Sequence, residues 1–111
     1  MPDRSDLLQG TLDVLVLKIL AAGPQHGWGI SLRIQQLSED VLQVNQGSLY
    51  PALYRLEGRG WIQGRWVEKP GQRSRRHYRL TAQGRKVLAE QRRGWRQFVV
   101  AMRRITGIDY A

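Results

Sequence analysis

Two groups of polar side chains near the middle of the chain have the chemistry needed to bind a polyanion. The first group occupies the outward positions of a helical segment, and its members can all form hydrogen bonds while none is acidic: Gln46, Ser48, Tyr50, Tyr54 and Arg55. The second group consists of four cations within eight residues: Lys69, Arg73, Arg75 and Arg76. Because guanidinium groups bind phosphates and base edges in two-point geometry, nucleic acid is the partner that these residues indicate.

The positive charge of the chain is concentrated in its second half. The 111 residues include 18 Lys+Arg and 9 Asp+Glu, for a net charge of +9. Residues 1–54 carry three basic and five acidic side chains, which gives −2, whereas residues 55–104 carry fifteen basic and three acidic ones, which gives +12. A solvated, solubilising surface is the alternative interpretation, since net charge affects solubility as well as the choice of partner.

Composition argues against several other classes of protein. Hydrophobic residues make up 41% of the chain, enough for one packed core, and there is no cysteine. No metal-ligand cluster, nucleophile–base pair or carboxylate pair stands out, so we expect neither an enzyme nor a cofactor nor a bound metal. No apolar run reaches the roughly 18–20 residues of a membrane span, and the N-terminus lacks a signal-peptide pattern. We therefore expect a cytoplasmic protein with no membrane partner.

The elements that would position the two polar groups follow from hydrophobic periodicity. We predict a short arm over residues 1–8, helices over residues 11–22, 27–38 and 46–59, and a short strand over residues 41–44. The third helix has its inward positions spaced i, i+3, i+4 and i+7, at Leu49, Ala52, Leu53 and Leu56. Residues 61–67 and 75–80 are predicted as a hairpin around a loop that contains Pro70 and Gly71.

A long final helix is predicted from its cap at Thr81 to about Thr106, and it carries a heptad seam with Gln91 as the polar member. The seam lies beyond the rest of the fold, so it has little of its own chain to pack on. The first helix also has apolar residues outside its main stripe, which favours burial on more than one side. A second subunit would cover both helices, so we expect a homodimer. The expected dimer interface, which is also the candidate ligand site, consists of Val14, Leu17, Leu88, Trp95, Phe98, Val99, Met102 and Ile105.

The predicted order of elements is typical of a winged helix-turn-helix, so the fold class is mostly α with a small β-hairpin. We expect residues 1–80 to form the DNA-binding domain and residues 81–111 the C-terminal dimerisation helix, within one compact structural unit. In this architecture the third helix enters the major groove of double-stranded DNA. The hairpin, or wing, presents its cations to phosphates or to the adjacent minor groove.

Residues 46–57, with the sequence QGSLYPALYRLE, followed by GWI at 60–62, resemble the signature of PadR-type transcriptional regulators. Residues 10–12, 26–30 and 76–81 agree with the same pattern. The resemblance implies a homodimeric bacterial repressor of a palindromic operator that dimerises through its N- and C-terminal helices. The chain resembles the short subgroup with one C-terminal helix, and it has His77 where an aromatic residue is common in the family.

Several residues have a second interpretation. Arg55 could pair with Glu57 or Glu39 on the surface, and Arg79 could pair within the fold. The tyrosines of the third helix could complete the edge of the core with their hydroxyl groups in water. Three of the tryptophans are interpreted as core or rim packing rather than as stacking platforms: Trp28, Trp61 and Trp66.

Trp95 leaves the role of the dimer seam open. It either packs the seam or, as the resemblance to ligand-sensing short members implies, lines a pore in which a small apolar or aromatic ligand stacks between subunits. The second reading makes the chain a small-molecule receptor, multidrug or phenolic, that releases DNA when it is occupied. Binding of RNA is less favoured, because the hairpin offers few aromatic residues for stacking bases.

Overall fold

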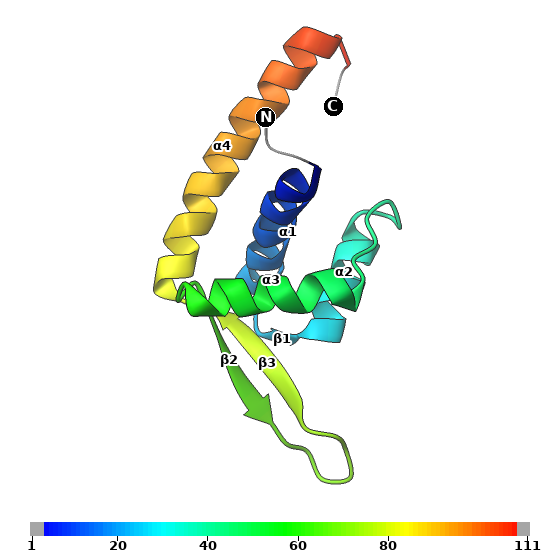
Figure 1. Cartoon of the computed structure of the whole chain (residues 1–111), viewed down its shortest axis with the longest axis vertical. Helices are drawn as coiled ribbons and strands as arrows, with labels where there is room; N and C mark the ends of the chain where they lie inside the picture. Colours follow the sequence, from blue (N-terminus) through cyan, green and yellow to red (C-terminus); the bar gives the residue numbers. More distant parts are fainter. Residues whose placement is uncertain (1–3, 109–111) are drawn as a thin grey trace.

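The computed structural model describes the backbone of residues 4–108 and the side chains of residues 11–108. These residues form a helical body from which a β-hairpin projects (Figure 1), in the order α1 (Arg4–Ala21), β1 (Gln25–His26), α2 (Gly27–Leu37), α3 (Gln46–Gly58), β2 (Ile62–Val67), β3 (Arg75–Leu80) and α4 (Ala82–Thr106). Strand β3 lies between β1 and β2, and Tyr78 is opposite both Gln25 and Gly64. The mostly α winged-helix fold expected from the sequence is confirmed.

Two local predictions are wrong. Residues 41–44 form a loop with Val41 79% exposed, and the short strand lies instead at Gln25–His26, where it pairs with β3. Glu39 and Asp40 have positive φ angles of 51° and 68° in the turn after α2, and residues 41–44 pair with no strand of the sheet. The predicted arm is also shorter, because α1 already begins at Arg4. Residues 1–3 of that arm lie outside the described residues.

Helix α1 is the centre of the core, where it packs against α2, α3, β3 and α4. Its Val16 and Leu17 are completely buried, as are Leu49 and Leu56 of α3. Burying side chains of this size stabilises the fold by about 1.5–3 kcal/mol each. Elements of the same chain therefore cover Leu17, whose apolar position had suggested contact with a second subunit.

Side-chain caps fix where three of the helices begin. The His26 Nδ1 accepts the Gly29 N–H at 3.1 Å at the start of α2, and the Asn45 Oδ1 accepts the Ser48 N–H at 2.9 Å at the start of α3. The Thr81 Oγ1 accepts the Gly84 N–H at 3.0 Å, which confirms the predicted cap of α4. Each cap satisfies an N–H that has no partner within its helix.

Helix α4 extends away from the winged-helix body (Figure 1). Its buried residues are Gly84 and Leu88, both near its start. The molecule measures 54 × 29 × 27 Å, and its radius of gyration of 15.4 Å exceeds the roughly 13 Å of a compact domain of this length. Most of α4 is therefore a projecting arm rather than part of the core.

Candidate nucleic-acid interface

Helix α3 presents a polar and aromatic face on the side opposite the core. Tyr54 is 82% and Tyr50 46% exposed, and Gln46 and Ser48 are exposed at the start of the helix. These four of the five predicted contact residues can reach a partner. Since none is charged, α3 offers hydrogen bonds and ring surface rather than electrostatic attraction.

Arg55 is the exception on α3, because its guanidinium is already engaged. Its Nη2 lies 3.1 Å from the Oδ1 of Asp13 on α1, and Asp13 is only 8% exposed. Burial raises the pKa of Asp13 above its ordinary value, and the charge of Arg55 opposes that rise. The alternative pairings of Arg55 with Glu57 or Glu39 are therefore wrong, and the pair formed with Asp13 ties α3 to α1.

The wing carries most of its predicted cations on the surface. Lys69 and Arg73 lie exposed in the loop between β2 and β3, and Arg75 is exposed at the start of β3. Helix α3 and the wing both line a groove of about 550 Å³. Its lining includes Tyr50, Arg73 and Arg75. The structure thus brings Tyr50 of the first predicted group together with Arg73, Arg75 and Arg76 of the second.

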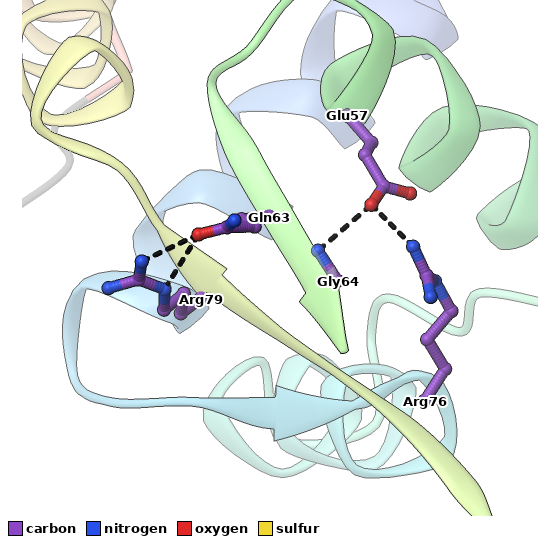
Figure 2. A network of polar contacts seen from close by, with 5 residues as sticks. All are labelled: Glu57, Gln63, Gly64, Arg76 and Arg79. Carbon is purple, nitrogen blue, oxygen red and sulfur yellow. Dashed lines mark hydrogen bonds and ion pairs between the residues drawn. The ribbon is translucent and has the colours of Figure 1, made fainter. Parts of the chain in front are cut away.

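Arg76 differs from the other wing cations, since it is half-buried and bound within the fold (Figure 2). Its Nη2 donates to the Oε2 of Glu57 at 2.6 Å, and the same oxygen accepts the Gly64 N–H at 2.9 Å. The guanidinium also lies 5.8 Å from the ring centroids of Trp66 and Tyr78. Glu57, near the end of α3, therefore links α3 to both strands of the wing.

Arg79 also pairs within the fold, as the sequence allowed. Its guanidinium donates through Nε, at 3.1 Å, and through Nη2 to the Oε1 of Gln63 on the neighbouring strand. In Figure 2 this pair lies apart from the Glu57 network, on the other side of the hairpin. It links β2 to β3 across a solvent-exposed sheet face.

Two tryptophans that were interpreted as packing residues are prominent on the surface. Trp28 at the start of α2 is 56% exposed and Trp66 on β2 is 65% exposed, and both line the groove beside Tyr50. Trp61, in contrast, is half-buried and packs against the core. Trp66 lies opposite Arg76 in the pairing of β2 with β3, so the two side chains share one face of the hairpin. The sequence pattern alone does not determine this register.

The heptad seam of α4 divides into a buried start and an exposed remainder. Leu88 is 6% exposed and belongs to the core of its own chain, whereas Trp95, Phe98 and Ile105 are 47%, 52% and 81% exposed. The Trp95 and Phe98 rings stack at a centroid distance of 5.4 Å with an interplanar angle of 23°. Three other residues predicted at the dimer interface are half-buried: Val14 on α1, and Val99 and Met102 on α4.

Among the side chains of residues 11–108, no group of three or more His, Asp or Glu residues is arranged to hold a metal ion. In the same part of the chain, no helix combines the length and the apolar character needed to cross a membrane.

Comparison with known proteins identifies a family and a related regulator. The model of the transcriptional regulator PadR-like family matches residues 16–90. A transcriptional regulator of Mycobacterium tuberculosis is 44% identical over 59 residues, which span 53% of this chain and 54% of that protein.

Two solved structures are similar over nearly the whole fold. A transcriptional regulator from Clostridium thermocellum superimposes with a TM-score of 0.81 at 26% identity and covers 93% of this chain and 97% of its own. A PadR-like transcription factor from Bacteroides fragilis gives a TM-score of 0.77 at 29% identity over 92% and 96% of the two chains. The chain therefore belongs to the PadR-like family of transcriptional regulators.

Proposed function

We propose that the chain is a homodimeric, sequence-specific repressor that binds a palindromic operator in double-stranded DNA. The observation that carries this proposal is the exposed, acid-free face of α3, with Tyr54 82% exposed, beside the wing cations. One α3 would enter each major groove, and the cations of the wing would contact phosphates or the adjacent minor groove. Residues 1–80 would thus bind DNA and residues 81–111 would join the subunits.

The recognition helix and the wing must keep a fixed angle for this mode of binding. Glu57 supplies that constraint, because one of its carboxylate oxygens binds both the Gly64 N–H of β2 and the Arg76 guanidinium of β3. In this proposal Arg76 holds the wing in place, while Lys69, Arg73 and Arg75 contact DNA. A prearranged surface of this kind loses less conformational entropy on binding.

The exposed part of α4 supports the proposed dimer. The chain has an accessible surface of 8367 Å², against about 6,300 Å² for a compact monomer of 12.8 kDa. The exposed rings of the seam contribute to this surface, and apolar patches of this kind mark interaction sites on proteins. Pairing of two α4 helices through Trp95, Phe98 and Ile105 would bury them.

A second candidate function is reception of a small apolar or aromatic ligand at the dimer seam. The stacked, half-exposed rings of Trp95 and Phe98 favour it, because a flat molecule could stack on the same surface. Ligand binding would then change the spacing of the two α3 helices and release DNA. Quenching of Trp95 fluorescence by planar phenolic compounds, abolished in Trp95→Phe, would support this function, and unchanged emission would count against it.

Members of the family are transcription regulators rather than enzymes, and we propose a cytoplasmic location, where such a regulator meets DNA.

Fluorescence anisotropy tests the proposed sequence-specific binding of DNA. The protein should bind duplex DNA from its own promoter more tightly than random duplex, with an affinity that falls steeply as salt increases. Equal affinity for both duplexes would contradict sequence-specific binding.

Two variants separate the proposed roles of helix and wing. Tyr54→Ala should reduce the preference for the promoter, whereas Arg73→Ala should weaken binding to both duplexes by a similar factor and lower the salt slope by about one. Arg55→Ala is less informative than Tyr54→Ala, because Arg55 also holds Asp13. The division of roles fails if the two variants change both duplexes in the same way.

A further inference from the structure

A small, strongly basic pocket lies on the side of the wing that faces away from Glu57. It has a volume of about 130 Å³ and is formed where β1 pairs with β3, next to the loop that joins β2 to β3. Its polar lining residues come from three segments and include no acid: His26, Lys69, Gln72, Arg73, Arg75 and His77. A water molecule occupies about 30 Å³ in the liquid, so the pocket holds roughly four waters or one small ion.

The hydrogen bonds of His26 place two donor groups next to each other in this pocket. The Nδ1 of His26 accepts the Gly29 N–H and caps α2, so in the neutral ring the proton must lie on Nε2. That Nε2 is 3.1 Å from the Nη1 of Arg75, which can only donate. Two donors therefore face each other, and an oxygen that accepts from both would satisfy them.

The surroundings of His26 add positive charge and no compensating negative charge within the pocket. The His77 ring lies edge-on to it at a centroid distance of 5.4 Å. Burial, and then the charges of Arg75, His77 and Lys69, hold the pKa of His26 below its ordinary value. The backbone N–H of Gly29 is already used by Nδ1, so the free donors are those on Nε2 and on the cationic side chains. An anion would relieve this repulsion.

We propose that this pocket is an oxyanion site that takes a phosphoryl group, with one oxygen shared between the His26 Nε2–H and the Arg75 guanidinium. Lys69 and Arg73 supply further positive charge from the loop, and charge-assisted hydrogen bonds of this type are the strongest available to such groups. The phosphoryl group comes either from the DNA backbone or from free phosphate. The first source rests on the proposed function, and the second is independent of it.

Nuclear magnetic resonance of the histidine rings in the full-length protein tests the proposal. Inorganic phosphate is titrated in one arm, and saturating promoter duplex in a phosphate-free buffer in the other. The expected result is a shift of the His26 Nε2 resonance and a rise in the pKa of His26 in at least one arm, since a bound anion favours the protonated ring. A response to phosphate identifies a free-ion site, and a response to duplex alone identifies a backbone contact.

Matched variants of β3 identify the residues responsible. Arg75→Gln removes the second donor, and Arg79→Gln removes an exposed arginine further along β3 that is bound to Gln63. Arg75→Gln should abolish the His26 response and weaken binding of the responding anion about tenfold or more, the loss expected for one charge-assisted hydrogen bond. Arg79→Gln should leave both unchanged.

A third variant separates the pocket from the fold. In His26→Asn the new side chain can still cap α2, because Asn is a favoured capping residue, but the Nε2 donor is gone. This variant should keep its thermal unfolding temperature and bind the responding anion as weakly as Arg75→Gln. The proposal is overturned if neither phosphate nor duplex shifts His26, or if Arg75→Gln and Arg79→Gln behave alike. Specific DNA binding without any His26 response would refute the oxyanion site and leave the proposed function intact.

Discussion

At the scale of single residues, Arg55 was expected on the surface, whereas in the structure it forms an ion pair with Asp13. Arg55 lies on the outer flank of α3, yet it turns toward the first helix, where Asp13 is buried. The sequence contained a signal for this, since Asp13 is a single acid within a long apolar helical run. The partner could not be read from the pattern, because it depends on how α1 and α3 cross.

Removing Arg55 should destabilise the fold. Arg55→Ala leaves the Asp13 carboxylate buried without its partner, and we expect the free energy of unfolding to fall by about 1.5–3 kcal/mol. Urea denaturation measures this. Adding Asp13→Asn should restore part of the loss, because a neutral amide is less costly to bury. A wild-type midpoint for Arg55→Ala would show that the pair contributes nothing.

The deficit of Arg55→Ala should also depend on pH. Burial already raises the pKa of Asp13 above its ordinary value of 3.8, and loss of the Arg55 charge removes an influence that lowers it. At Asp13 the folded state therefore binds a proton more readily than the unfolded state, so the contribution of this carboxyl to stability becomes more favourable as pH falls. The difference from wild type should shrink in urea titrations between pH 7 and pH 4, whereas a constant difference would contradict this account.

At the scale of elements, periodicity located the helices and the wing but not every strand. The spacing of Leu49, Leu53 and Leu56 fixes the inner face of α3, and the loop with Pro70 and Gly71 fixes the hairpin. Strand β1 has only two residues, which is too short to carry a period-two pattern. The contacts of Glu57 with the wing likewise could not be predicted from the sequence, because they depend on the angle between α3 and β2.

The join between the wing and α4 should tolerate no added side chain. A Cβ at Gly84 would lie 2.0 Å from the backbone carbonyl oxygen of Trp61, whereas at Gly94 it would meet nothing within 4 Å. Gly84→Ala should cost about 1–3 kcal/mol through overpacking, and Gly94→Ala should stabilise the helix by up to about 1 kcal/mol. Thermal unfolding of the two variants checks this, and equal midpoints would show that α4 is not seated as described.

At the scale of the whole molecule, the shape follows from one helix that is longer than the core it covers. Helix α4 has 25 residues, but its buried residues, Gly84 and Leu88, lie within the first seven. The heptad seam was visible in the sequence, but the covering of Leu17 and Leu88 by the same chain was not, since burial depends on the tertiary arrangement. The exposed rings beyond Leu88 are what remains for a partner.

Disruption of the seam should separate the subunits without unfolding them. Phe98→Asp places a charge among the rings of α4, whereas Gln97→Asp places the same charge at a neighbouring position outside the seam. Sedimentation of the wild type and of Gln97→Asp should give about twice 12.8 kDa, and Phe98→Asp should give one chain mass with unchanged helical circular dichroism. A monomeric wild type would contradict the proposed dimer.

The arrangement of the DNA site tests the central claim most directly, since it depends on recognition helix, wing and dimer together. Random duplexes would be selected for binding to the full-length protein and sequenced. The account predicts two inverted half-sites whose centres lie about 10–10.5 base pairs, or a multiple of that distance, apart. Enrichment of a single unrepeated site, or of no sequence at all, would contradict it.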